Sequence, residues 1–282
     1  MASVVLATAL GSVGFAAWPL RDQVGAVIPA GSSRRIVTLA PDVTELVFAL
    51  GAGRHLVAVA PFSDFPPAAA ALPRVAVSDP EAIVAARPDL VLASTAGNDP
   101  AVVTALRRVG VRVATVDVTS CARLAEACLL LGQLVAAAET GQRLAADITS
   151  HCDAARRRAA DLPRRTALYV AWWDPLMVAG PGTVHHDLLA LAGLDNRAPA
   201  RGGRYPRVDP EVLLDPALQV LVAPADPDSR PLVDALLRRP AGLRLRRGTL
   251  PLIWLPADPA SRPGPRLLLA LDVLLAAREA AP

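Results

Sequence analysis

The sequence predicts an α/β protein of two lobes, each built on a central, mostly parallel sheet. The main observation is a pattern that occurs twice. The tripeptides at 79–81 and 209–211, both Asp-Pro-Glu, are followed at the same spacing by the apolar runs 90–93 and 220–223. Continuous apolar runs of this length are typical of strands buried on both faces of a sheet. The 282 residues are also enough for two domains.

Each copy of the pattern begins with residues that favour the start of a helix. An Asp at the N-cap accepts a hydrogen bond from a free backbone N–H of the first turn. Pro suits the first helical position, where no N–H is needed. The Glu that follows lies near the positive end of the helix dipole. We therefore expect a short helix before each buried strand, with Glu81 and Glu211 at equivalent positions in the two lobes.

The composition indicates a chain with a sizeable core. Hydrophobic residues make up 53% of it and charged residues 20%, which excludes a disordered protein. The net charge is +3, and all 29 basic residues are Arg. These Arg are scattered and form no basic stripe with aromatic residues, so we expect no nucleic-acid partner.

The three cysteines do not form a metal-binding pattern. Cys121 and Cys128 lie seven residues apart on one predicted helix, about 10 Å along its axis, which is too far for a disulfide. We expect Cys121, Cys128 and Cys152 to be small buried apolar residues.

Residues 2–20 carry no charge and are rich in Ala, Val, Leu and Gly. Nineteen such residues nearly span a bilayer, and a secretory signal is the other interpretation, although the basic n-region of a signal is missing. We expect residues 1–33 to be a signal or an anchor with its spacer, and the protein to be extracytoplasmic.

The segment 34–119 is expected to form the N-terminal lobe, because strand and helix patterns alternate in it, as in a parallel sheet with crossover helices. The expected strands are 34–39, 56–60, 90–93 and 112–116, and the expected helices are 44–50 and 100–109 together with the one that starts at 79. Binding loops in such sheets follow the carboxyl ends of the strands. Here they would be 62–64, 94–98 and 117–120.

Residues 120–162 are expected to link the lobes. Apolar residues recur there every three or four positions, which predicts one long helix or two in tandem, with Gly132 and Gly141 as the only breaks.

The segment 163–282 is expected to form the C-terminal lobe. Its expected strands are 166–171, 220–223 and 252–255, and its expected helices are 184–192, 230–238 and 266–278. Residues 172–175, 195–207 and 256–264 are interpreted as loops.

Five segments in order resemble the helical-backbone substrate-binding proteins of ABC importers, which serve siderophores, haem and vitamin B12. The first is residues 35–53, which begin Arg-Ile-Val-Thr-Leu-Ala-Pro-Asp and end Leu-Gly-Ala-Gly. The others are Phe-Ser-Asp-Phe-Pro-Pro at 62–67, Arg-Pro-Asp-Leu-Val-Leu-Ala-Ser-Thr-Ala-Gly-Asn at 87–98, Tyr-Pro-Arg-Val-Asp-Pro-Glu at 205–211 and Asp-Pro-Ala-Ser-Arg-Pro-Gly-Pro-Arg at 258–266. The likeness extends over residues 34–280 and is strongest to the vitamin B12-binding members.

The resemblance implies two α/β lobes joined by a long rigid helix, with the ligand in a cleft between them. It also implies a monomeric receptor that is not an enzyme, has no cofactor of its own, and works with an ABC permease and its ATPase. In this family an exposed Glu on each lobe pairs with Arg residues of the permease, and Glu81 and Glu211 stand at those positions. The alternative role is that each Glu only complements its helix dipole.

The resemblance also implies a corrinoid, vitamin B12, as the transported ligand. A corrinoid is a large disc fringed with amides, so it needs flat apolar walls and a few polar contacts. The expected walls are Phe62, Trp172, Trp173 and Tyr205, with one residue of the Trp pair in the cleft and the other possible in the core. The expected polar and loop contacts are Ser63, Asp64, Ser94, Gly97, Asn98, Asp258 and Arg262.

Two alternatives remain open for this site. Asp258 and Arg262 are equally compatible with an ion pair that closes their own loop. Arg201, Arg204 and Arg207 bring positive charge near the cleft, which favours an anionic iron–siderophore or haem as the alternative ligand.

Metal binding and catalysis are not expected. His185 and His186 are adjacent, but a transition-metal site needs three or four ligands, and the other histidines, His55 and His151, lie on distant segments. We expect the histidine pair at a helix start. No Ser-His-Asp or Cys-His arrangement is placed by a motif, so an enzyme is the weaker hypothesis of another class.

Overall fold

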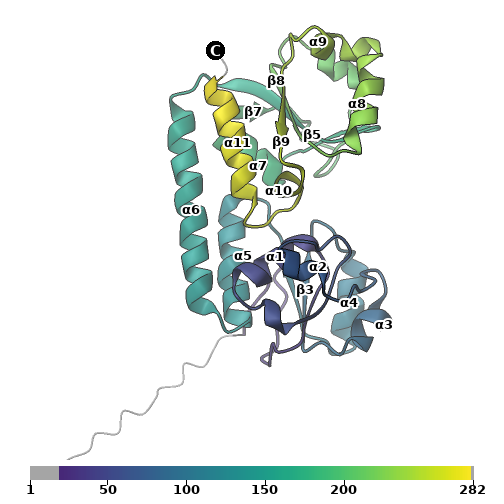
Figure 1. Ribbon diagram of the computed structural model, residues 1–282, viewed down its shortest axis with the longest axis vertical. Coiled ribbons are helices and arrows are strands. Elements are labelled where there is room, and N and C mark those ends of the chain that lie inside the picture. Colours follow the sequence, from purple (N-terminus) through teal and green to yellow (C-terminus); the bar gives the residue numbers. More distant parts are fainter. Residues whose placement is uncertain (1–18, 281–282) are drawn as a thin grey trace, which may run out of the picture.

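The computed structural model describes residues 19–280 and arranges them as two lobes stacked along the long axis of the molecule (Figure 1). The uncharged segment 2–20 therefore lies outside the described residues, apart from Pro19 and Leu20. Between residues 19 and 280, no helix combines the length and the apolar character needed to cross a membrane.

A four-stranded parallel sheet forms the centre of the N-terminal lobe. Its strand order is β2-β1-β3-β4, and it is built from β1 (Ile36–Thr38), β2 (Leu56–Val59), β3 (Leu90–Ser94) and β4 (Val113–Val116). Nearly every residue of these strands is buried. The predicted parallel sheet with crossover helices is confirmed.

The α-helices of this lobe all begin with proline. They are α1 (Pro41–Ala49), α2 (Pro67–Ala70), α3 (Pro80–Ala85) and α4 (Pro100–Arg108), and a 3₁₀ turn, η1 (Gly53–His55), precedes β2. Proline fits the first turn because its missing N–H has no partner there. For this reason α1 starts at Pro41 and not at the predicted residue 44.

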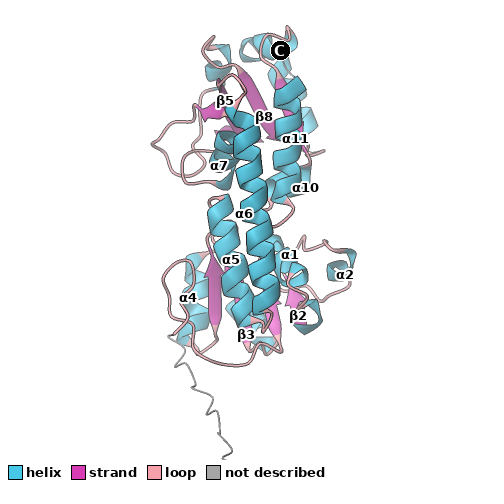
Figure 2. Cartoon of the chain, turned by 90° about the vertical axis from the view of Figure 1, so that its left-hand side faces the viewer, coloured by secondary structure: helices cyan, strands magenta, loops and turns pink. Residues whose placement is uncertain are grey.

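The segment between the lobes is a helical hairpin of α5 (Cys121–Leu134) and α6 (Ala138–Ala160). The 23 residues of α6 extend over about 35 Å, and the helix runs beside both lobes (Figures 1 and 2). The expectation that Gly132 and Gly141 break the helix was wrong. Both lie inside helices at the contact of α5 with α6, where a Cβ on Gly141 would stand 2.6 Å from the carbonyl oxygen of Cys128. The chain turns instead at Ala136, which adopts a left-handed φ of 57°.

The hairpin also corrects the expectation for two cysteines. Cys121 of α5 and Cys152 of α6 form a disulfide, with their Cα atoms 6.6 Å apart, whereas Cys128 is free and buried. Spacing along one helix could not indicate this pair, because the two residues meet only after α6 folds back against α5.

The C-terminal lobe contains a five-stranded mixed sheet. Its members are β5 (Arg165–Trp173), β6 (Leu176–Val178), β7 (Leu194–Asn196), β8 (Val220–Pro224) and β9 (Leu252–Leu255). Strands β7 and β8 pair parallel with β5, and β9 pairs parallel with β8, whereas β6 pairs antiparallel with the end of β5. The predicted loop at 172–175 is therefore wrong in its first half, because the large aromatic side chains of Trp172 and Trp173 continue the strand.

The helices of this lobe include one that returns to the linker. They are α7 (Val184–Leu191), α8 (Ser229–Leu237), α9 (Leu243–Arg246), α10 (Ala257–Ser261) and α11 (Leu267–Ala280), with the 3₁₀ turns η2 (Pro210–Leu214) and η3 (Pro240–Gly242). Helix α11 packs beside the upper half of α6 (Figures 1 and 2). The expected loops at 195–207 and 256–264 were only partly right, because β7 ends within the first and α10 occupies part of the second. The lobe limits predicted at 119/120 and 162/163 fall between elements and remain predictions.

The repeated pattern folds as expected at both of its sites. The carboxylates of Asp79 and Asp209 each accept a hydrogen bond of 2.9 Å from the backbone N–H of the Glu two residues later. The first copy leads through α3 to β3, and the second leads through η2 to β8; both strands are completely buried. Glu81 and Glu211 are exposed.

The disulfide gives the first testable prediction. A disulfide closing 31 residues should stabilise the protein by about 2–4 kcal/mol, because it restricts the unfolded chain. A reductant should lower the wild-type free energy of unfolding, measured with denaturant, by that amount. It should leave a Cys121→Ala/Cys152→Ala double variant unchanged. Unfolded wild type should titrate one free thiol, and three thiols would contradict the assignment.

Candidate functional site

The carboxyl ends of the parallel strands in the two sheets point toward each other, so the loops that follow them meet between the lobes. A cavity of about 300 Å³ lies there. The N-terminal lobe contributes Thr95 and Ala96 after β3, and Val118 and Thr119 after β4. The C-terminal lobe contributes residues 182–185, 204–205, Ser261 and Pro263. This volume is at the lower end of the range for small-molecule sites.

One wall of the cavity is a hydrogen-bonded pair of aromatic rings, His185 and Tyr205. The Nε2 of His185 lies 2.8 Å from the carbonyl oxygen of Ala260, which can only accept, so Nε2 carries the hydrogen. Burial lowers the pKa of His185 to about 4, so the ring is neutral and Nδ1 is an acceptor. The hydroxyl of Tyr205 therefore donates to Nδ1 at 3.2 Å, and its oxygen lone pairs stay available.

The opposite wall is joined to the C-terminal lobe by an ion pair. The guanidinium of Arg204 donates to Oδ1 of Asp117 at 2.9 Å and to Oγ1 of Thr95 at 3.3 Å. Thr95 also donates to Asp117. Burial raises the pKa of Asp117, but the hydrogen bonds from Thr95 and Arg204 outweigh it and bring that pKa below its usual value. The carboxylate is therefore ionised at neutral pH.

A second group of ion pairs joins the lobes beside the cavity. Arg266 donates hydrogen bonds to Glu45 of α1, and its Nε lies 2.8 Å from Oε2 of that carboxylate. The guanidinium of Arg262 lies 3.4 Å from Oε1 of the same Glu45. Arg262 also pairs with Asp64 at 2.7 Å and with Asp258 at 3.2 Å. The loop-closing pair considered for Asp258 and Arg262 thus exists, and the same Arg262 bridges to the N-terminal lobe.

Three residues expected to contact ligand are instead engaged in buried or half-buried hydrogen bonds. Ser94 is buried and donates to Oδ2 of Asp42 at 2.6 Å. Ser63 is buried and accepts from Thr44 at 3.1 Å. Asn98 donates to the carbonyl oxygen of Leu39 at 2.6 Å and accepts from the N–H of Ser94 at 2.8 Å. These side chains hold the loops after β1, β2 and β3 in place. Ser63 and Ser94 offer no exposed surface to a ligand in this structure, and their ligand contacts remain predictions.

The expected aromatic walls divide into exposed and buried residues. Phe62, after β2, is 80% exposed and adopts a left-handed φ of 61°, and Trp172 at the end of β5 is 41% exposed. A non-glycine residue with positive φ is strained, and such strain is concentrated at functional sites. Trp173 is only 4% exposed and packs in the C-terminal core, 6.0 Å from the ring of Trp254, so it offers no surface to a ligand.

Among the ligand residues predicted from the sequence, all of which are described, Tyr205 alone lines the cavity. Phe62, Gly97 and Trp172 are exposed outside it. The sequence reasoning did not identify Thr95 and His185, although Thr95 lies inside the predicted loop 94–98. The position of His185 at a helix start does not indicate that it lines a cavity. Its ring is buried against Tyr169, with ring centroids 4.2 Å apart.

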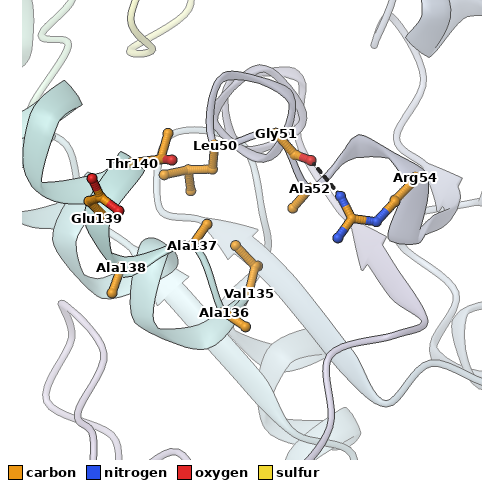
Figure 3. A pocket seen from close by; sticks show the side chains of 10 residues that line it. All are labelled: Leu50, Gly51, Ala52, Arg54, Val135, Ala136, Ala137, Ala138, Glu139 and Thr140. Atoms are coloured by element: carbon orange, nitrogen blue, oxygen red, sulfur yellow. Dashed lines mark hydrogen bonds between the residues drawn. The ribbon is translucent and has the colours of Figure 1, made fainter.

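A second hollow of similar volume lies beside the turn between α5 and α6 (Figure 3). It is lined mostly by small side chains such as Ala136 and Ala138, and Arg54 turns toward the carbonyl oxygen of Gly51, 3.1 Å away. No loop after a strand reaches it, so the cavity between the lobes is the better candidate. Nowhere in residues 19–280 do three or more potential metal ligands gather.

Comparison with known proteins gives consistent results along nearly the whole chain. The family model described as periplasmic binding protein matches residues 36–242. The curated vitamin B12-binding protein of Yersinia pestis (strain Pestoides F) is 30% identical over 251 residues, which cover 88% of this chain and 87% of that protein.

Two solved structures extend the comparison to three dimensions. The periplasmic vitamin B12 binding protein BtuF of Vibrio cholerae aligns with a TM-score of 0.73 and 27% identity, over 87% of this chain and 96% of that one. The periplasmic heme-binding protein RhuT from Roseiflexus sp. RS-1 aligns with a TM-score of 0.73 and 28% identity, over 88% and 100%. The two-lobed fold is thus shared by proteins with different ligands.

The buried carboxyl of Asp42 gives a pH prediction. Burial raises its pKa from 3.8 to about 6, against hydrogen bonds from Ser94 and Val43. As the pH rises from about 4 to about 7, the unfolded chain loses this proton before the folded protein does, so stability falls by at most about 3 kcal/mol. Denaturant unfolding across this range should show that Asp42→Asn gains stability relative to wild type as the pH rises.

Asp64→Asn is the matched control for this measurement. The hydrogen bond from Arg262 lowers the pKa of Asp64, so the stability linked to this carboxyl is lost only below about pH 4. Between about pH 4 and about pH 7 the stability of Asp64→Asn relative to wild type should therefore stay nearly constant. If both variants follow the same trend, the assignment for Asp42 is wrong.

Proposed function

The chain belongs to the periplasmic binding protein family, and on that premise we propose that it is the extracytoplasmic receptor of an ABC importer, binding a corrinoid such as vitamin B12 between its lobes. The observation that carries this proposal is the cavity formed by the loops that follow the strands of both sheets. Ligands of open α/β sheets bind at this edge. The Yersinia relative, named for vitamin B12, supports the choice of ligand.

The exposed aromatic residues support a flat ligand. Phe62 follows β2 of one lobe and Trp172 lies near the end of β5 of the other, and both side chains are exposed. Trp172 pairs with Met177, which in turn bridges to Arg207, so it lies beside the Arg-rich segment that enters the cavity. A corrinoid disc could contact such rings once the lobes separate. The function proposed is capture and delivery, without turnover.

The disulfide supports export. Disulfides persist in oxidising compartments and are rare in the cytosol. The Cys121–Cys152 bond is therefore compatible with the proposed location outside the cytoplasm, reached by means of the segment 2–20.

One observation favours a second candidate, an anionic iron chelate or haem. Arg204 lies in the cavity wall next to the phenol of Tyr205, and Arg201 and Arg207 lie on the same segment. A carboxylate ligand would pair with such a guanidinium. The Roseiflexus protein of similar fold, named for heme, is consistent with this alternative.

Calorimetric titration of residues 19–282, which keep the buried Asp22 and Ile28, with cyanocobalamin tests the ligand. We expect one saturable site and a loss of affinity of about three- to tenfold in Phe62→Ala, because an exposed ring contributes stacking and apolar contact without supporting the fold. Val109→Ala, which shortens an exposed side chain at the end of α4, should bind like wild type. Binding of haem or a ferric siderophore, but not of cyanocobalamin, would favour the second candidate.

The permease-docking role of Glu81 and Glu211 predicts a separation of binding from transport. The double variant Glu81→Ala/Glu211→Ala should bind ligand normally and lose uptake in cells, because carboxylates that pair with permease Arg residues are removed. Glu139→Ala is the matched control, since Glu139 is also exposed in a helix first turn and would lose only the dipole interaction. Unchanged uptake in the double variant would contradict the docking role.

A further inference from the structure

Two groups of side chains join the lobes, and they differ in burial. We call Glu45, Arg262 and Arg266 the hinge cluster, and Arg204, Asp117 and Thr95 the latch. The hinge cluster is nearly enclosed, with the Glu45 side chain 3% exposed. In the latch, the side chains of Arg204 and Asp117 are 45% and 20% exposed.

The hinge cluster is built to stay closed. Arg266 bonds Glu45 through two nitrogens and lies over the ring of Phe65, 3.9 Å from its centroid. Separating these groups would break a two-point ion pair and a cation–π contact that are shielded from water, and shielded ion pairs are stronger than exposed ones. The lobes therefore cannot part at this point without loss of stability.

The latch is built differently. The backbone of Arg204 is fixed in the C-terminal lobe, because its carbonyl oxygen accepts a hydrogen bond of 2.8 Å from the N–H of Gly180. Its side chain extends across the cavity to the N-terminal lobe. Within the described chain, the side-chain bonds of Arg204 go only to Asp117 and Thr95. Its contact across the lobes thus depends on one half-exposed guanidinium.

Opening the latch leaves no unpaired buried charge. Asp117 has a second cation nearby, since Arg123 lies 4.0 Å from its carboxylate and bonds its backbone carbonyl oxygen at 3.3 Å. Arg204, when released, would be hydrated. Exposed ion pairs contribute little to stability and are weakened by salt.

We propose that Arg204, Asp117 and Thr95 form a latch that closes the cavity between the lobes and opens to admit ligand, while the hinge cluster stays intact. The proposal rests on the function proposed above, in which ligand enters between the lobes. The cavity has a volume of about 300 Å³, which is at the lower end of the range for small-molecule sites. A large ligand therefore needs the cavity to open. Because only molecules with an open latch can bind ligand, the apparent affinity equals the intrinsic affinity multiplied by the open fraction.

The distance between spin labels on the two lobes tests the latch without any ligand. Cysteines for labelling replace Val109 in the N-terminal lobe and Arg238 in the C-terminal lobe, both exposed, in a Cys128→Ala background. Arg204→Ala and Asp117→Asn should each shift the distance distribution toward the open form. High salt should do the same to the protein with an intact latch and should change Arg204→Ala little.

Arg201→Ala is the control, because Arg201 lies on the same segment, carries the same charge and is exposed. It should keep the distances of the protein with an intact latch. In stopped-flow mixing with cyanocobalamin, the two latch variants should associate faster by up to about fivefold. Unchanged distances in both latch variants would overturn the latch. If no variant binds cyanocobalamin while the distances shift as expected, the latch stands and the corrinoid function fails.

Discussion

The arrangement of the two lobes depends on one buried carboxylate. Glu45 projects from α1 and is bonded by Arg266 and approached by Arg262, which both come from the other lobe. A carboxylate removed from water is stable only where cations and donors replace its hydration, so these segments must remain together. Asp187 of α7 adds a second contact by accepting a hydrogen bond of 2.7 Å from the N–H of Cys121. These contacts set the separation at which the loops of the two sheets face each other.

Hydrogen bonds from buried polar side chains fix the conformation of the loops. Asp42, Ser94 and Asn98 bond one another or the backbone beneath the loop after β3, and Thr44 bonds Ser63 beneath the loop after β2. Buried polar groups must be satisfied in this way, and a satisfied network holds one conformation. The side chains that look most suitable for ligand contact in the sequence are therefore used inside the lobe, and Thr95 is left at the surface of the cavity.

Local patterns predicted the fold well and the site less well. The N-terminal sheet and both copies of the repeated pattern follow from apolar runs and from Asp-Pro-Glu, because capping and burial act over a few residues. The disulfide and helix α10 did not follow, because each depends on groups distant in sequence. Strand β6 did not follow because it is only three residues long and pairs with the end of β5, which was predicted to be a loop. The same limit applies to the cavity. Tyr205 was identified through its motif, whereas His185 became part of the wall only through Ala260 and Tyr169.

The chemistry of the cavity limits how a ligand can be held. His185 is neutral and both of its nitrogens are engaged, so it offers no charge and no free lone pair. Tyr205 uses its hydrogen for His185 and can accept from a ligand donor. Arg204 is the only cation among the described residues of the wall, and Asp117 neutralises it. The amides of a corrinoid can supply a donor to Tyr205 without competing for Arg204, whereas a carboxylate would replace Asp117. Which ligand is preferred therefore depends on whether that guanidinium keeps its partner in the other lobe.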